Sequence, residues 1–229
     1  MTTEDAPTGE SVWLRDAGER PPRRATPLTL ERIVAAAVSE LDAHGAEKLT
    51  MRRLAQRLDV SSTALYWHVK TKEDLLDLAT DHIIGEVPPP APDLEPRAAI
   101  YALLLDWHAV MVAHPWSPGF FSRPLLGPNV LARTEYLQAE LTSAGLSGID
   151  LACATRLLVN FVIGAAMADA TWRWLDNPAV LDKARAHIAD RAHLYPTLTT
   201  SGFIEAPWSD DELFSRAVER ALETVIPPA

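Results

Sequence analysis

The feature that most constrains the fold of this chain is the spacing of its apolar residues. Over the first well-patterned stretch these recur every three or four positions, at Leu30, Ile33, Val34, Ala37, Val38 and Leu41. That spacing places them on one face of an α-helix. Apolar and polar residues do not alternate over any stretch long enough for a sheet, and no internal repeat is present. The sequence therefore predicts an all-α protein.

The same spacing predicts further helices along the chain. They are expected at residues 50–58, 62–69, 72–84, 97–113, 129–144, 148–175, 178–194 and 209–225. Thr29 and Thr50 can each cap the first amides of a helix, and Gly45 can end the first helix in a left-handed conformation. Residues 114–128 and 195–208 are rich in proline and glycine and are expected to be irregular.

Proline marks the main boundary in the chain. The segment Val87–Pro92 holds four prolines, which lack an amide donor and end any helix. Residues 1–26 are polar and without periodicity, and predict a disordered tail. Residues 27–75 predict a domain of three helices that leads into the connecting helix 72–84. Residues 88–229 predict a second, larger helical domain.

Composition excludes several classes of protein. The chain has one cysteine, Cys153, which excludes an internal disulfide, a structural zinc cluster and a thiol redox pair. It contains no charge-free stretch of about 18 apolar residues, so we expect no membrane-spanning segment. The N-terminus is polar and acidic and lacks the apolar segment of a secretory signal. We therefore expect a cytoplasmic protein.

Charge is distributed unevenly along the chain. The net charge is −10, but residues 20–74 contain ten Lys and Arg against seven Asp and Glu, a net charge of +3. The other residues therefore carry a net charge of −13. Such asymmetry favours a nucleic-acid-binding module attached to an acidic domain. Chance clustering of charge on an ordinary solvated surface is the alternative.

Two short helices in this basic window predict a helix-turn-helix. A turn of three residues, beginning at Asp59, separates the helices expected at 50–58 and 62–69. Ala55 is small where the two helices must cross closely, and aspartate tolerates the left-handed conformation that such a turn requires. The second of these helices is too short to be stable alone and must be held by its neighbours. In a helix-turn-helix this helix enters the major groove of DNA.

Two runs carry a resemblance to a known family, LTMRRLAQRLDV at 49–60 and ALYWHVKTK at 64–72. They make residues 29–84 similar to the DNA-binding domain of the Tet repressor family, and LYWHVK is especially close to tetracycline repressors. The rest of the chain matches more loosely, in helix order and in short fragments. The resemblance implies an N-terminal helix-turn-helix DNA-binding domain and a larger helical ligand-binding and dimerisation domain over residues 88–229.

Carried over by position, the resemblance implies two sets of contacts with double-stranded operator DNA. Base-edge contacts are expected from Arg52, Ser62 and Thr63. Phosphate contacts are expected from Thr50, Tyr66, His68 and Lys72. Trp67 is assigned mainly to packing, with a contact to the DNA backbone as the alternative. Because Ser62 and Thr63 stand where tetracycline repressors have Gln-Pro, the operator sequence is expected to differ.

The second domain is expected to form a homodimer and to bind a ligand. The helix at 148–175 is apolar nearly all round, so it must be buried on several sides, and with the helix at 209–225 it predicts a four-helix dimer interface. A two-fold dimer fits a palindromic operator. Candidate ligand-binding residues are Trp107, Met111, Phe121, Asn160, Phe161, Met167 and Trp172. They predict a pocket for an apolar or aromatic small-molecule inducer. The alternative is ordinary core packing for any one of the aromatic residues and a satisfied core amide for Asn160.

The chain departs from tetracycline repressors at their two ligand-binding histidines. One of these holds the drug and the other ligates its magnesium ion. The matching places in this chain fall at about Pro88 and Phe121. The sequence therefore predicts no metal ligand, no cofactor and an inducer of a different kind.

Two alternatives to a ligand-released repressor stay open from the sequence. One is a DNA-binding dimer that is independent of ligand or is controlled by a protein partner. The other is an all-α enzyme built on Asp106, His108 and His114, although no recognisable catalytic motif supports it. Arg20, Arg23 and Arg24 lie in the N-terminal tail. They predict either an arm in the minor groove of DNA or an ordinary solvated segment.

Overall fold

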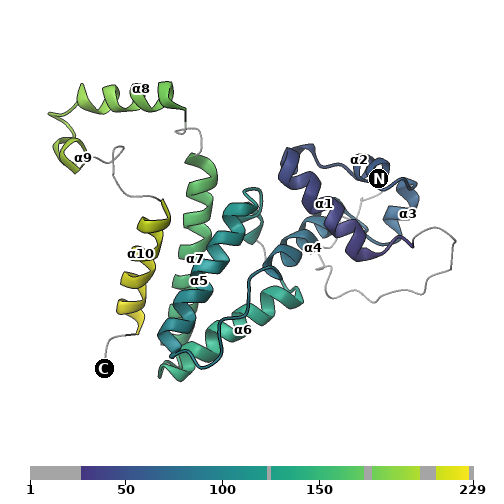
Figure 1. Cartoon of the computed structure of the whole chain (residues 1–229), viewed down its shortest axis with the longest axis horizontal. Coiled ribbons are helices and arrows are strands. Elements are labelled where there is room, and N and C mark those ends of the chain that lie inside the picture. Colours follow the sequence, from purple (N-terminus) through teal and green to yellow (C-terminus); the bar gives the residue numbers. More distant parts are fainter. Residues whose placement is uncertain (1–26, 123–124, 173–176, 202–209, 227–229) are drawn as a thin grey trace, which may run out of the picture. The chain divides into compact units, whose positions relative to one another are not determined.

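The computed structural model describes residues 27–122, 125–172, 177–201 and 210–226. Over these ranges the chain is helical and has no strand, which confirms the predicted all-α class (Figure 1). The α-helices are α1 (Leu30–His44), α2 (Met51–Arg57), α3 (Ser62–Tyr66), α4 (Lys72–Ile84), α5 (Pro96–Ala113), α6 (Pro128–Ser143), α7 (Gly148–Trp172), α8 (Pro178–Ala189), α9 (Pro196–Ser201) and α10 (Asp210–Val225). The predicted tail, with Arg20, Arg23 and Arg24, lies outside the described residues.

The helices divide into two compact units. The first contains the chain up to Pro88 together with Gly119–Tyr136, and the second contains Pro89–Pro118 together with the chain from Leu137 onward. This division differs from a single boundary at residue 88, because the segment 119–136 groups with the N-terminal helices. Helix α6 begins in the first unit and ends in the second.

In the first unit α1 packs against α2 and α4, and α2 packs against α3. Helix α3 has only five residues and is held through Leu65, which is fully buried, as expected for a helix too short to be stable alone. Ala55 is buried, so α2 presents a small side chain inside the unit, as predicted. The other buried apolar residues of α1 to α4 are Ile33, Val34, Ala37, Val38, Leu41, Met51, Leu54, Leu75, Leu76, Leu78, Ala79, Ile83 and Ile84.

Local capping interactions begin the helices of this unit. Thr29, Thr50 and Thr71 each accept a hydrogen bond, at 3.0–3.3 Å, from the amide three residues later. The caps predicted at Thr29 and Thr50 are therefore confirmed. Asp59 has φ +54°, the predicted left-handed conformation. Gly45 also has a positive φ, +76°, but its ψ of 165° differs from the expected left-handed helical conformation.

A buried carboxylate joins α4 to the start of α6. Asp81 Oδ1 accepts hydrogen bonds from the amides of Asn129 (3.0 Å) and Val130 (2.9 Å), and Oδ2 accepts one from Asn129 Nδ2 (2.9 Å). The first amides of a helix have no partner within it, so Asp81 caps α6 from another helix. Burial raises the pKa of Asp81 above its ordinary value of 3.8, although the three hydrogen bonds act in the opposite direction. This contact explains why residues 119–136 group with α4.

Gly127 packs against the same carboxylate, and a Cβ at this position would overlap Asp81 Oδ1 and Cγ. We expect Gly127→Ala to lower the free energy of unfolding by about 1–3 kcal/mol, because the crowded carboxylate must shift away from its three donors. Urea unfolding measures the change. The control is Gly119→Ala, where a Cβ meets nothing within 4 Å and a change below about 0.5 kcal/mol is expected. Equal effects of the two substitutions would contradict the packing at Gly127.

In the second unit α5 and α7 lie side by side and α10 packs along both (Figure 1). An aromatic stack links the three helices. The His108 ring lies 3.7 Å from the Phe214 ring, and the Phe161 ring lies 5.5 Å from the Phe214 ring. His108 Nε2 also lies 2.9 Å from Asp169 Oδ2. Apolar residues buried in α5, α7 and α10 are Ala99, Ile100, Leu103, Leu104, Trp107, Met111, Ala154, Leu158, Val162, Ala166, Phe214, Val218 and Leu222.

Some element boundaries differ from those predicted. The α3 helix ends at Tyr66 rather than near Val69, because the chain turns before the cap at Thr71 begins α4. Residues 196–201, expected to be irregular, form α9, whose first residue is proline; proline is tolerated in the first turn of a helix. Short 3-10 helices occupy Ala46–Lys48 and Pro118–Ser122.

Candidate functional site

The candidate DNA-binding surface is formed by α2 and α3. Arg52 on α2 and Thr63 on α3 are exposed, Ser62 is half-buried, and Tyr66 is 44% exposed at the end of α3. Beneath them, Leu54 and Leu65 are fully buried, so the two helices present these polar side chains from a packed support. The three residues expected to contact base edges are thus all at least partly open to solvent. Their contact with bases stays a prediction.

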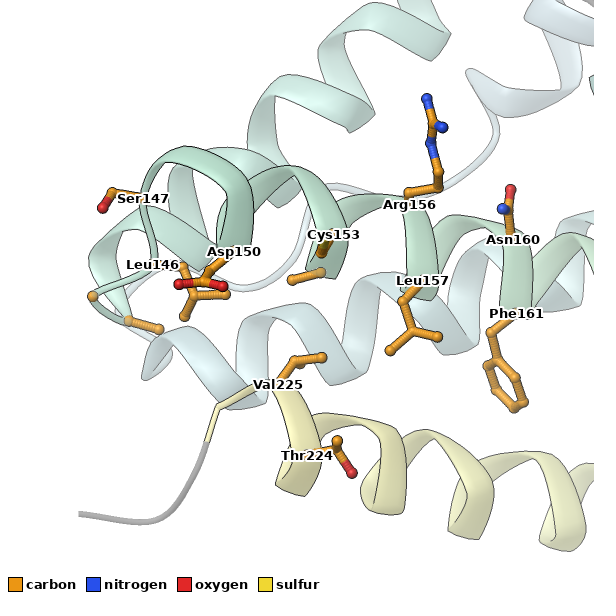
Figure 2. Close-up of a pocket in the computed structure, with 13 residues that line it drawn as sticks. Leu146, Ser147, Asp150, Cys153, Arg156, Leu157, Asn160, Phe161, Thr224 and Val225 are labelled. Carbon is orange, nitrogen blue, oxygen red and sulfur yellow. The ribbon is translucent and has the colours of Figure 1, made fainter.

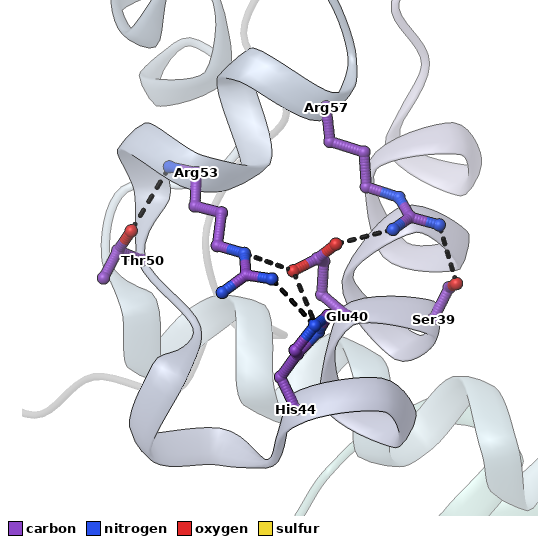
Figure 3. A network of polar contacts seen from close by, with 6 residues as sticks. All are labelled: Ser39, Glu40, His44, Thr50, Arg53 and Arg57. Atoms are coloured by element: carbon purple, nitrogen blue, oxygen red, sulfur yellow. Dashed lines mark hydrogen bonds and ion pairs between the residues drawn. The ribbon is translucent and has the colours of Figure 1, made fainter.

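Helix α2 carries three arginines, which differ in their ion pairs within the protein. Arg53 Nε lies 2.7 Å from Glu40 Oε2, and Arg57 Nη1 lies 2.5 Å from Glu40 Oε1 (Figure 3). Arg52 is exposed and forms no ion pair with any described residue. Of the three guanidinium groups of α2, that of Arg52 is therefore available to a ligand, and its contact with a base stays a prediction. Glu40 is not among the predicted site residues, although it lies on the inward-facing side of α1, seven residues after Ile33.

Trp67 is not a packing residue, contrary to the prediction. Its side chain is 77% exposed immediately after α3, and Lys70 Nζ lies 5.8 Å from the centre of its ring. Helix α3 ends at Tyr66, so the helical periodicity that would give a buried position does not apply to Trp67. An exposed tryptophan beside a lysine suits contact with the DNA backbone, which was the alternative assignment. Lys70 was not among the predicted contacts.

Two predicted phosphate-binding residues already make contacts within the protein. Thr50 Oγ1 accepts the hydrogen bond that caps α2, and its hydroxyl proton can still be donated. Lys72 Nζ donates to the carbonyl oxygen of Ala46 at 2.8 Å. An ammonium group has three donors, so this bond does not exhaust its capacity. His68 is half-buried and Tyr66 is exposed. Phosphate binding by these residues stays a prediction.

The Glu40 carboxylate has a shifted pKa. Burial tends to raise the pKa, but the hydrogen bond from Arg57 and the charges of Arg53, Arg57 and His44 lower it below its ordinary value of 4.5. A carboxyl whose pKa is depressed by folding stabilises the fold at pH values above its pKa in the unfolded chain. That stabilisation is lost as the pH falls through the folded-state pKa, below 4.5.

We therefore expect the free energy of unfolding of the wild-type protein to decrease more steeply below pH 4.5 than that of Glu40→Gln, which has no carboxyl to protonate. Urea unfolding at a series of pH values measures both curves. Parallel curves for the two proteins would show that Glu40 is not preferentially ionised in the folded state.

The predicted ligand-binding residues occupy different environments. Trp107 and Met111 are buried in the second unit, and Phe121 is half-buried in the first unit. Trp107 Nε1 is buried and has no hydrogen-bond partner among the described residues. A buried donor without an acceptor costs about 1–3 kcal/mol, so this indole can be satisfied by a bound molecule. The side chain of Trp172 lies outside the part of the structure that is described.

An open hollow of about 1060 Å³ lies between the first half of α7 and the end of α10. Asn160 and Phe161 are among its lining residues. Leu157 and Phe161 point toward α10, whereas Arg156 and Asn160 point to another side of α7 (Figure 2). The hollow therefore includes two predicted ligand-binding residues, and Trp107 and Met111 do not line it.

Helix α7 has a long apolar face that this chain leaves uncovered. Ile149, Leu157 and Met167 are 75%, 49% and 44% exposed, and Leu213 on α10 is 44% exposed. By length and composition alone α7 could cross a membrane, with 22% of the relevant stretch buried. It nevertheless contributes Leu158, fully buried, to the core of the second unit. One face of α7 is therefore packed in the core of the second unit, and another face is exposed and apolar.

Comparison with known proteins identifies the family of both parts of the chain. Residues 33–79 match the family model described as bacterial regulatory proteins, tetR family. Residues 93–226 match the tetracyclin repressor-like C-terminal domain. Together the two models cover the helix-turn-helix and nearly all of the chain that follows the proline-rich boundary.

Individual relatives agree with this assignment. An HTH-type transcriptional regulator of Saccharopolyspora erythraea is 41% identical over 199 residues, 86% of this chain and 83% of the relative. Apo ActR from Streptomyces coelicolor has a TM-score of 0.76 at 29% identity, covering 88% of this chain and 96% of ActR. BioQ with its double-stranded DNA operator has a TM-score of 0.58 at 31% identity, covering 66% of this chain and 92% of BioQ. This chain belongs to the tetR family of bacterial regulatory proteins and is a DNA-binding transcriptional regulator.

Proposed function

We propose that this regulator is a homodimeric repressor that binds a palindromic operator and leaves it when a small apolar or aromatic molecule binds. The observation that carries the DNA-binding part is the exposed surface of α2 and α3. There Arg52, Thr63 and Tyr66 are exposed on helices whose inner faces are buried. Arg52 has no ion pair among the described residues. An arginine of this kind suits a bidentate contact with guanine in the major groove.

The homodimer is supported by the open apolar face of α7. Leu157 and Met167 are about half exposed in the single chain, and Leu213 adds apolar surface from α10. Contiguous exposed apolar surface marks an interaction site, and a two-fold interface pairs one such patch with its copy. Two helices from each subunit form a four-helix interface, as the sequence predicted. A dimer of this symmetry matches the palindromic operator.

The inducer is supported by a relative and by a buried donor. ActR from Streptomyces coelicolor was solved in complex with actinorhodin, and it has a TM-score of 0.76 to this chain. In this chain Trp107 Nε1 is buried without an acceptor among the described residues. A ligand for this site would have an apolar or aromatic body and an acceptor atom for the indole. Trp107 and Met111 are the predicted contacts that the second unit buries.

Ligand can release DNA only if it binds better to a form of the dimer whose two α3 helices no longer match successive major grooves. The chain offers one continuous element for this coupling. Helix α6 starts in the first unit, where Asp81 of α4 caps it, and ends in the second unit. A shift of α6 on ligand binding would therefore act on α4, the helix that follows the DNA-binding segment.

The proposal is tested by selecting duplexes from a random DNA library with the wild-type protein. Enrichment of a palindrome is expected, because each subunit contributes one reading surface. Compounds are then screened by thermal shift, since a specific ligand raises the melting temperature by mass action. A hit should also release the selected duplex. Selection of no sequence would contradict the regulator's operator binding. A palindrome that no compound releases would favour control by a protein partner.

A cytoplasmic location is proposed because the target is genomic DNA. The enzyme alternative depended on Asp106, His108 and His114. His108 is 3% exposed, stacks on Phe214 and pairs with Asp169, which suits a structural role in the second unit. We therefore propose no catalytic activity and no cofactor.

A further inference from the structure

Glu40 on α1 holds two arginines of the DNA-binding unit at once. Its side chain is 6% exposed, and its two carboxylate oxygens lie 2.7 Å from Arg53 Nε and 2.5 Å from Arg57 Nη1 (Figure 3). Each oxygen thus takes one guanidinium group. The two positive charges of these arginines exceed the single negative charge of the buried carboxylate.

A second contact on α1 restrains each of these arginines. Arg57 Nη2 donates to Ser39 Oγ at 2.8 Å, and Arg53 Nη2 lies 2.9 Å from His44 Nε2 (Figure 3). Both guanidinium groups are therefore fastened to α1 through two of their nitrogens. Two contacts on each guanidinium favour one orientation of the group and oppose its rotation toward another anion.

If they are released, the same two arginines add two partly exposed cations to the proposed DNA-binding surface. Their side chains are 40% and 44% exposed, and they lie on α2, the helix that also carries Arg52, the predicted base contact. Phosphate is the competing anion, and it accepts the same bidentate hydrogen bonds as a carboxylate. Every additional cation that reaches a phosphate strengthens binding to any DNA sequence equally.

From this geometry we propose that Glu40 determines the specificity of operator binding by withholding Arg53 and Arg57 from DNA phosphates. Arg52 stays available for base contacts, while its two neighbours are prevented from adding affinity that carries no sequence information. Glu40 acts through the arginines and does not itself contact DNA. The inference rests on the proposed DNA-binding surface of α2 and α3.

The test measures binding of Glu40→Gln to a short duplex of random sequence as a function of salt. The glutamine amide has no charge and only one acceptor oxygen, so it cannot pair with both guanidinium groups, and they become available to phosphate. The slope of log Kobs against log salt should become steeper by about 0.9 for each released arginine, or about 1.8 per subunit. For the dimer, which releases four arginines, binding should then weaken about a hundredfold more than in the wild type between about 50 and about 200 mM salt. The ratio of operator to random-sequence affinity should fall.

Two controls separate released arginines from a general change of charge. Glu47→Gln removes the same charge from the 3-10 helix Ala46–Lys48, and Glu47 has no ion pair among the described residues. Its salt slope should equal that of the wild type. Adding Arg53→Gln and Arg57→Gln to Glu40→Gln should return the slope to the wild-type value. An unchanged slope in Glu40→Gln, or a steeper slope that survives removal of both arginines, would overturn the proposal.

A third measurement does not depend on the folding of Glu40→Gln. Arg57→Gln in the wild-type background leaves Glu40 paired with Arg53, and it should not alter the salt slope if Arg57 is withheld from phosphate. A slope reduced by about 0.9 per subunit, or about 1.8 for the dimer, would show that Arg57 already contacts DNA, and would overturn the proposal. Failure of the wild-type protein to bind any selected duplex is a different result. It would contradict the proposed function itself.

Discussion

Replacement of Arg52 by alanine is expected to weaken binding to the selected operator at least about 30-fold. A bidentate arginine–guanine contact contributes about 1–3 kcal/mol, and a two-fold dimer loses one in each half-site. The expected loss is therefore about 2–6 kcal/mol. Discrimination between bases should relax at the position that Arg52 contacts, while random-sequence binding changes much less.

Fluorescence anisotropy at one fixed salt concentration measures this effect with the operator and with its single-base variants. The matched control is Arg216→Ala on α10, which removes the same charge from a side chain that is 71% exposed in the second unit. Arg216→Ala should bind the operator like the wild type. If Arg52→Ala bound the operator with an affinity within about twofold of the wild type, Arg52 would not be a base contact.

The second large effect is expected at the open face of α7. Leu157→Arg places a charge in the proposed dimer interface, and an uncompensated buried charge costs about 3–5 kcal/mol. We expect the dissociation constant of the dimer to rise about a thousandfold, so that the protein sediments as a monomer at micromolar concentration. Operator binding should be lost with the dimer, because one subunit holds only one half-site.

Analytical ultracentrifugation and operator binding test this expectation together. The matched control is Leu131→Arg on α6, because Leu131 and Leu157 are both 49% exposed. Leu131→Arg should leave both the dimer and operator binding intact. A dimer that persists in Leu157→Arg would place the interface elsewhere, and a monomer that still binds the operator fully would contradict the proposed two-fold recognition.

Features that depend on neighbours within a few residues were predictable. Thr29 and Thr50 cap their helices through the amide three positions later, so sequence spacing alone locates them. The left-handed conformation of Asp59 was predictable from the tight turn and from the tolerance of aspartate for positive φ. The predicted end of α3, at Val69, was less accurate, because the helix ends at Tyr66. The turn that brings Thr71 to cap α4 ends the helix before Trp67 and leaves that ring 77% exposed.

The different states of the three α2 arginines were not predictable in this way. Arg52, Arg53 and Arg57 are chemically identical and close in sequence. Only the crossing of α1 and α2 brings Glu40 within ion-pair distance of two of them. Asp81 is a similar case, because its partners at the start of α6 lie almost fifty residues later in the chain. Both carboxylates lie on helix faces that local periodicity assigns to the apolar core.

By itself, then, the sequence determined the all-α class, most helix boundaries and the DNA-binding motif, since these depend on the periodicity and capping of short continuous segments. The tertiary structure decided which charged groups are already bound and which stay open to a ligand. It also decided that α7, apolar nearly all round, is buried on one side and leaves Leu157 and Met167 uncovered. The physical reason is that an ion pair or a buried face depends on distances between helices, and those distances are set by packing across the whole unit.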